Sequence, residues 1–242
     1  MTGRPWPPAG LVLTPGAGSG RDHPSLLAVE ESLAPLGIAV DRVDFPYRIA
    51  GRRAPDRPPV LLQTVRSAAD ALARRLGVDG DRIALGGRSM GGRMCSMAVA
   101  EGQVVAGLVL VSYPLHPPGR PERLRTDHFA ALRVPCLFIS GTRDAFGAPE
   151  ELVAATKAIR GPVSHVWVEG GDHGLGGREA EVAAAVHRWL ARTTAPARRS
   201  ARLPGGPGFS PSRGAVTPRR TAVASRAGRP VPRGSRGRPS SG

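Results

Sequence analysis

The chain has 242 residues with 34 Lys or Arg against 19 Asp or Glu, which gives a formal net charge of +15. This length suffices for one sizeable domain. No apolar run approaches the ~20 residues that span a bilayer, and the N-terminus has no apolar signal-peptide stretch, so we expect a cytoplasmic protein without a membrane span. Cys95 and Cys136 lie in apolar predicted elements, which suits reduced, buried thiols.

Strand-like apolar runs alternate with helical patterns along the first four fifths of the chain. We expect strands at residues 11–14, 38–45, 82–85, 104–112, 135–140 and 164–168. We expect helices at residues 25–36, 60–76, 89–100, 149–159 and 179–191. Strict alternation requires parallel βαβ units whose strands are buried on both faces. The predicted fold class is therefore α/β, a three-layer sandwich with about six mostly parallel strands, and the connection at 114–134 leaves room only for a minimal lid.

The composition changes abruptly near residue 193. Residues 194–242 contain 11 arginines, no acidic residue and repeated Pro, Gly and Ser. Such a mixture cannot bury enough apolar surface to offset the entropy lost on ordering. We therefore expect an N-terminal extension at 1–9, a folded domain at 10–193 and a disordered tail at 194–242. The tail could contact nucleic acid through phosphates, but Phe209 is its only aromatic residue, so we do not expect a nucleic-acid partner.

Residues 87–91 read Gly-Arg-Ser-Met-Gly, a G-x-S-x-G pattern between a predicted strand and a predicted helix. In a nucleophile elbow the serine lies on a strained turn between those two elements. Small residues two positions before and after it let the backbones pass. The context of the motif predicts that Ser89 is a nucleophile.

A serine hydroxyl needs a base to accept its proton and a third group to orient that base. Asp144 and His173 directly follow the fifth and sixth predicted strands, at the sheet edge where Ser89 follows the third. Nucleophile, acid and histidine come in the chain order of α/β-hydrolases. Asp144 could instead cap the next helix, and Asp172 is a competing acid, although neighbouring side chains such as Asp172 and His173 diverge. We favour Asp144 as the acid and His173, among six histidines, as the base.

Acyl transfer also needs donors for the oxyanion, and backbone N–H groups usually supply them. Met90 follows the nucleophile and Ala17 lies in the glycine-rich loop 16–20 after the first strand, so we predict these two as the oxyanion hole. The loop could be mistaken for a phosphate-binding loop. However, it lacks G-x-x-x-x-G-K-[ST], and Arg21 occupies the place of the third glycine of G-x-G-x-x-G. We expect no cofactor and no metal.

Five stretches carry a resemblance to a known family. They read Thr-Pro-Gly-Ala-Gly at 14–18, Asp-Phe-Pro-Tyr at 44–47 (with Arg-Arg-Ala-Pro at 52–55), Gly-Gly-Arg-Ser-Met-Gly-Gly-Arg at 86–93, Gly-Thr-Arg-Asp at 141–144 and Gly-Asp-His at 171–173. With these, residues 10–192 resemble the small α/β-hydrolases of the dienelactone-hydrolase-like group. They are most similar to the family of testis-expressed protein 30 and the third subunit of the animal non-specific-lethal chromatin complex.

The resemblance implies Ser89 as nucleophile, Asp144 as acid and His173 as base, the choice already made from the residues. Dienelactone hydrolases carry a cysteine nucleophile, and the serine here argues against their particular substrate.

The sequence thus predicts a serine hydrolase that cleaves a small-molecule ester or thioester through an acyl-enzyme. An open, shallow site follows from the short connection at 114–134. Four side chains are candidates to meet an acidic or polar substrate: Tyr47, Arg88, Arg93 and Arg143. The alternative is a noncatalytic interaction module on the same fold, with the basic tail as its contact arm.

Overall fold

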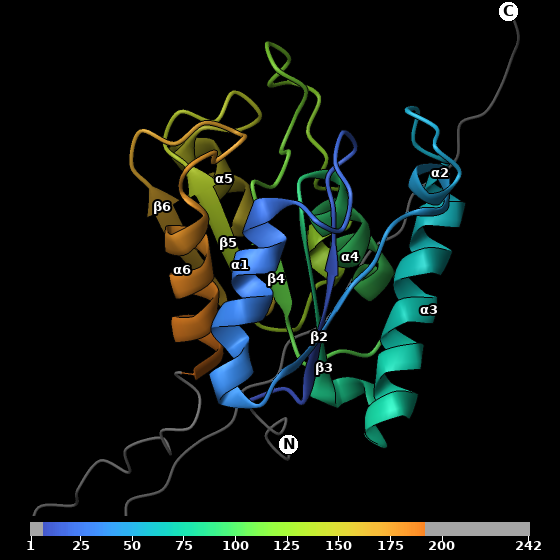
Figure 1. The fold of residues 1–242 in the computed structure, drawn as a ribbon. Coiled ribbons are helices and arrows are strands. Elements are labelled where there is room, and N and C mark those ends of the chain that lie inside the picture. Colours follow the sequence, from blue (N-terminus) through green and yellow to red (C-terminus); the bar gives the residue numbers. More distant parts are fainter. Residues whose placement is uncertain (1–6, 192–242) are drawn as a thin grey trace, which may run out of the picture. The chain divides into compact units, whose positions relative to one another are not determined.

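The computed structural model describes residues 7–191, which contain a six-stranded sheet in the order β2-β1-β3-β4-β5-β6 (Figure 1). All neighbouring strands pair in parallel. The strands are β1 (Gly10–Thr14), β2 (Ala39–Arg42), β3 (Ile83–Arg88), β4 (Leu108–Val111), β5 (Cys136–Gly141) and β6 (Val163–Val168). The α-helices are α1 (Pro24–Leu33), α2 (Pro46–Ile49), α3 (Pro58–Leu76), α4 (Met90–Ala100), α5 (Pro149–Thr156) and α6 (Glu179–Ala191). Three 3-10 turns complete the elements: η1 (Ala34–Leu36), η2 (Gly80–Arg82) and η3 (Phe129–Ala131).

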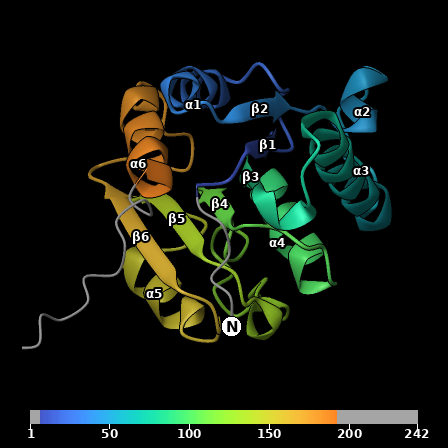
Figure 2. The same ribbon diagram turned by 90° about the horizontal axis from the view of Figure 1, so that it is seen from below.

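The helices form one layer on each face of the sheet, as the view from below shows (Figure 2). Helices α1 and α6 pack together on one face, and α3, α4 and α5 cover the other. The predicted three-layer α/β arrangement is therefore confirmed. Because every strand runs in the same direction, the loops that follow the carboxyl ends of β1, β3, β5 and β6 meet at one edge of the sheet.

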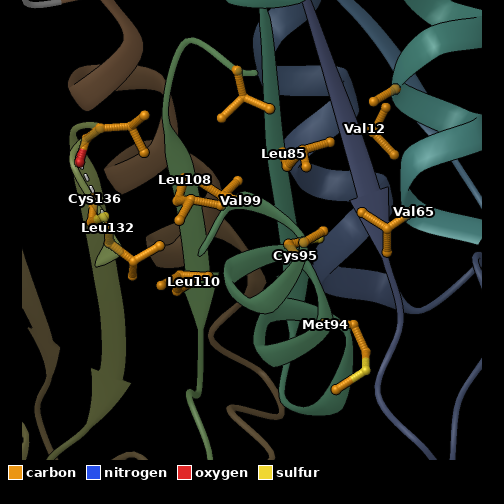
Figure 3. Packing of buried hydrophobic residues seen from close by; sticks show 14 of the residues in the cluster. Val12, Val65, Leu85, Met94, Cys95, Val99, Leu108, Leu110, Leu132 and Cys136 are labelled. Atoms are coloured by element: carbon orange, nitrogen blue, oxygen red, sulfur yellow. Dashed lines mark hydrogen bonds between the residues drawn. The ribbon is translucent and has the colours of Figure 1, made fainter. Parts of the chain in front are cut away.

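Two apolar cores lie on the two faces of the sheet because side chains alternate along each strand. In β1, Leu11 belongs to the core under α1 and α6, whereas Val12 belongs to the core under α3 and α4. In β4, Leu108 and Leu110 pack with Val99 of α4 (Figure 3). This burial on both faces explains why the central strands read as continuous apolar runs in the sequence.

Two strands are shorter than predicted. β2 ends at Arg42 rather than at residue 45, because Pro46 has no N–H for a strand ladder and instead opens α2, a short helix that the sequence did not indicate. β4 begins at Leu108 rather than at residue 104, because Val104 is 55% exposed in the loop that leads into the strand. The connection at 114–134 contains only η3, as expected for a minimal lid.

The predicted tail at 194–242 lies outside the described residues, as does most of the predicted extension at 1–9. The domain boundaries therefore remain predictions. Within residues 7–191, no helix is both long and apolar enough to cross a membrane.

Candidate active site

Ser89 lies on a strained turn between β3 and α4. Its backbone has φ 50° and ψ −117°, a conformation that L-residues rarely adopt. A Cβ on Gly87 would lie 2.3 Å from Thr14 Oγ1, and one on Gly91 would lie 2.5 Å from the carbonyl oxygen of Pro15. Only glycine at both positions lets the end of β3 and the start of α4 pack this closely against the end of β1. The turn is therefore fixed by backbone packing on both sides of Ser89.

A chain of hydrogen bonds connects Ser89 to His173 and Asp144. Ser89 Oγ lies 2.8 Å from His173 Nε2, and His173 Nδ1 lies 2.9 Å from both carboxylate oxygens of Asp144. The Asp144 side chain is 1% exposed and that of His173 is 19% exposed. With the Nδ1 proton directed at the carboxylate, Nε2 is free to accept the serine proton. The structure thus brings the three predicted residues together from three separate loops.

The loops that carry Asp144 and His173 are held against each other by backbone contacts. The Arg143 N–H donates to the Gly171 carbonyl at 2.8 Å, and the Thr142 N–H donates to the Val168 carbonyl at 3.1 Å. A Cβ on Gly141 would lie 2.1 Å from the Gly171 carbonyl oxygen, so only glycine permits this approach. The geometry of the acid and the base therefore depends on contacts between two loops that are distant in the sequence.

Asp172, the competing acid, has other partners. It is exposed, and its Oδ1 accepts hydrogen bonds from the N–H groups of Gly174 at 2.8 Å and Leu175 at 3.0 Å. This pattern is a local side-chain turn that shapes the loop after β6. Nor does Asp144 cap α5, whose N-cap is Ala148.

The other five histidines have partners away from Ser89. His23 accepts from the Ser25 N–H, His116 contacts Glu151, His128 contacts Ser96, His165 stacks on Trp167, and His187 contacts the Ser32 carbonyl. They hold elements together and leave His173 as the histidine beside the nucleophile.

The predicted oxyanion donors lie in two segments that adjoin Ser89. Met90 is the first residue of α4, where an N–H has no acceptor within the helix. Ala17 lies in the loop after β1, and a Cβ on the preceding Gly16 would lie 3.5 Å from Ser89 Cβ. Within the described part of the chain, the Ala17 N–H has no hydrogen-bond acceptor. Both groups are therefore available as donors beside the nucleophile.

Tyr47 and Arg88, predicted to meet substrate, are used inside the protein instead. Tyr47 is fully buried, and its hydroxyl donates to the Ala17 carbonyl at 2.8 Å, so it cannot reach a substrate. Arg88 Nη2 donates to the carbonyls of His173 at 2.8 Å and Gly174 at 3.1 Å. Burial lowers the pKa of Arg88, and Asp144 and Asp172 counteract part of that shift. Arg88 thus supports the loop that carries the base.

Arg93 and Arg143 differ in their position relative to Ser89. Arg93 lies one turn along α4, and its N–H donates to the Ser89 carbonyl at 3.1 Å. Its Nε is buried and has no hydrogen-bond partner among residues 7–191. Arg143 is exposed and lines a hollow of about 340 Å³ beside Asp172 and Arg178, whose lining includes neither Ser89 nor His173. Arg93 therefore remains a candidate to meet substrate, whereas Arg143 borders a different depression.

Phe146 is a site residue that the sequence reasoning missed. Its ring stacks on the His173 imidazole with centroids 4.0 Å apart and planes at 29°, and its N–H donates to Asp144 Oδ1 at 2.8 Å. It therefore contacts both the base and the acid. The only signal in the sequence was an aromatic residue two positions after the predicted acid.

Neither cysteine competes with Ser89 as a nucleophile. Burial raises the pKa of Cys95 and of Cys136 to about 12, so both thiols stay protonated at neutral pH. Among the residues that the structure describes, no group of three His, Cys, Asp or Glu side chains is arranged to hold a metal ion.

A family comparison agrees with this architecture. The model of the alpha/beta hydrolase domain matches residues 7–196, and the chain therefore belongs to that family.

Solved structures with the same fold have low sequence identity to this chain. An alpha-beta serine hydrolase homologue from Coxiella burnetii is 20% identical, with a TM-score of 0.62 over 77% of this chain and 88% of its own. Est1E from Butyrivibrio proteoclasticus is 18% identical, with a TM-score of 0.63 over 78% and 89%. A dienelactone hydrolase from Anabaena variabilis is 22% identical, with a TM-score of 0.61 over 76% and 87%. At this identity the likeness extends to the fold alone.

Proposed function

We propose that this protein is a serine hydrolase that cleaves an ester or thioester of a small molecule. The observation that carries the proposal is the hydrogen-bonded chain from Ser89 through His173 to Asp144. These side chains come from loops after β3, β6 and β5, and no local structural need explains their convergence. The similar structures include an alpha-beta serine hydrolase homologue and the esterase domain of a Rhodothermus marinus protein, which agrees with the proposed reaction class.

In the proposed reaction, His173 Nε2 takes the proton of Ser89 as its Oγ attacks the acyl carbonyl. The buried carboxylate of Asp144 stabilises the imidazolium that forms. The N–H groups of Ala17 and Met90 donate to the oxyanion of the tetrahedral intermediate. The imidazolium then protonates the leaving alcohol or thiol, and water hydrolyses the acyl-enzyme by the same steps in reverse order. These roles require no cofactor.

For contacts to substrate we propose Arg93, which lies one turn along α4 from Ser89 and whose Nε has no hydrogen-bond partner among residues 7–191. Its guanidinium would suit an acidic or polar acyl group. We also propose that the chain belongs to the family of testis-expressed protein 30 and that the protein is cytoplasmic. The free, buried state of Cys95 and Cys136 is consistent with a reducing compartment.

A fluorophosphonate probe tests the proposal, because only an activated serine reacts with it. We expect the full-length protein to be labelled on Ser89 and to hydrolyse at least one member of a panel of p-nitrophenyl esters and acyl thioesters. Ser89→Ala should abolish labelling and lower turnover by several orders of magnitude.

Ser96→Ala is a matched control, since Ser96 Oγ also lies 2.8 Å from a histidine Nε2, that of His128. Ser96 is fully buried, and we expect this variant to be labelled as the wild type is. An unlabelled, inactive wild-type protein with an intact fold would instead favour the alternative, a noncatalytic interaction module.

A further inference from the structure

The segment Asp44–Tyr47 has no part in the reaction proposed above, yet it contacts the loop that carries Ala17. Phe45 and Tyr47 are fully buried, with their rings stacked at a centroid distance of 6.3 Å, and Pro46 opens α2 between them. Their burial fixes the segment in the core beside β1. From there, its two polar side chains reach the loop after β1 at two points.

The first point is the Ala17 peptide. Tyr47 donates its hydroxyl to the Ala17 carbonyl at 2.8 Å, and the Ser19 N–H donates to the Gly16 carbonyl at 3.2 Å. A trans peptide is planar, so the direction of the Gly16 carbonyl fixes the opposite direction of the Ala17 N–H. With both carbonyls held, the two peptide planes on either side of the Ala17 Cα are set. These contacts fix the direction of the Ala17 N–H, and among residues 7–191 they leave it without a hydrogen-bond acceptor.

The second point is the far end of the loop. Asp44 Oδ1 accepts from the Arg21 N–H at 2.7 Å, and a Cβ on Gly20 would lie 3.2 Å from that same oxygen. The loop between these two points is rich in glycine, which would otherwise leave its backbone free to change conformation. Burial raises the pKa of Tyr47, so its hydroxyl remains a donor at neutral and mildly basic pH.

We infer that Tyr47 and Asp44 are positioning residues of the oxyanion hole, which hold the loop from Gly16 to Arg21 so that the Ala17 N–H faces the oxyanion formed on Ser89. The inference rests on the proposed function, because it needs an acyl group on Ser89. It assigns a purpose to the Asp-Phe-Pro-Tyr motif, and it replaces the earlier prediction that Tyr47 meets substrate.

Tyr47→Phe tests the inference, with Tyr113→Phe as its matched control. Tyr113 is also buried, and its hydroxyl also donates to a backbone carbonyl at 2.8 Å, that of Arg125. Both variants remove the hydrogen bond that a buried tyrosine hydroxyl donates to a backbone carbonyl, so both should lower the melting temperature. Only Tyr47→Phe should lower kcat/KM, by roughly ten- to a hundredfold, because a misaimed donor loses much of its stabilisation of the oxyanion.

The affinity for a tetrahedral mimic separates this role from a merely structural one. A boronic acid inhibitor bound to Ser89 should lose affinity in Tyr47→Phe by about the factor lost in kcat/KM, while KM changes little. Asp44→Ala should show the same pattern, and Asp44→Asn, which keeps an acceptor for the Arg21 N–H, should recover most of the activity.

Equal losses of kcat/KM in Tyr47→Phe and Tyr113→Phe, or unchanged boronic acid binding in Tyr47→Phe, would overturn the inference. Wild-type labelling on Ser89 is measured first, so either result leaves the proposed hydrolase function standing. If Tyr47→Phe does not fold, the comparison of Asp44→Ala with Asp44→Asn gives the answer alone.

Discussion

The two sides of the candidate site are built in different ways. On the nucleophile side, Ser89 is set by close backbone packing between β1, β3 and α4, where Gly87 and Gly91 admit no side chain. On the acid–base side, Asp144 and His173 lie on loops that contact each other after β5 and β6 and are supported by Phe146 and Arg88. The first arrangement belongs to the core of the fold. We expect the second, which joins two loops, to be the side that substitutions disrupt at the smaller cost in stability.

The largest effect expected on the acid–base side comes from Asp144→Asn. The amide would leave the imidazole in the wrong tautomer, and kcat should fall by ~10³ to 10⁴ while the fold is kept. Asp172→Asn is the control. Among residues 7–191, Asp172 accepts hydrogen bonds only from the Gly174 and Leu175 N–H groups, so this substitution should lower kcat far less. Steady-state kinetics on the best ester of the panel give kcat for both variants. A larger loss of kcat in Asp172→Asn than in Asp144→Asn would make Asp172 the acid.

Two glycine substitutions test whether the sides differ in rigidity. In Gly91→Ala the new Cβ would meet backbone of β1 in the core, so we expect a loss of about 2–3 kcal/mol in the free energy of unfolding. In Gly141→Ala it would lie 2.1 Å from the Gly171 carbonyl oxygen, so the loop after β6 would have to move away from β5. Because that segment is a loop, we expect a smaller loss of stability than in Gly91→Ala, but a fall of ~10²-fold in kcat/KM, because the acid and base are misplaced.

Gly176→Ala serves as the control for both, since a Cβ there would have no atom within 4 Å. Denaturant unfolding and kinetics on the same preparations give both quantities. An equal loss of stability in Gly91→Ala and Gly141→Ala would show that the acid–base side is as rigid as the nucleophile side.

The features of the site that the sequence predicts are those that depend on local patterns, and those that it does not predict depend on contacts between distant segments. The Ser89 turn, the strand order along the chain and the choice of Asp144 over Asp172 follow from local patterns: G-x-S-x-G, apolar runs and position after a strand. The role of Tyr47 could not be read, because it depends on a contact with Ala17, 30 residues away in sequence. The presence of Phe146 in the site and the supporting role of Arg88 could not be read for the same reason, since stacking and carbonyl contacts between loops leave no periodic signal.

Phe146→Leu should affect the acid–base side more subtly. The ring of Phe146 stacks on the His173 imidazole, and leucine of similar bulk removes that stacking, so the base is positioned less well in the variant. We expect kcat/KM for the best ester of the panel to fall a few-fold. Phe146→Tyr keeps the ring and should keep kcat/KM, and an unchanged kcat/KM in Phe146→Leu would mean that the ring does not position the base.

The smallest effect concerns the stability of the nucleophile side in acid. His128 holds Ser96 of α4 at 2.8 Å, and its pKa is lowered to about 4, mainly by burial and then by Arg93, with Asp127 and Glu101 acting in the opposite direction. A histidine that binds its proton less tightly in the folded state than in the unfolded state stabilises the fold above pH ~6.5, and that contribution is lost as the pH falls towards 4.

His128→Gln keeps an amide that can bond to Ser96 but does not titrate, so the variant should lose less stability than the wild type between pH 6.5 and 4. Because His128 is partly exposed, we expect a difference of about 1–2 kcal/mol over this range.

His116 provides the contrast. The Pro117 carbonyl and then Glu151 raise its pKa, so its contribution is complete below pH ~6.5 and is lost only as the pH rises through its folded pKa. Chemical denaturation at a series of pH values, for the wild type, His128→Gln and His116→Gln, separates the two. Acidification should weaken the support of α4 behind Ser89 while the contact between His116 and α5 persists, and parallel pH profiles for all three proteins would refute this.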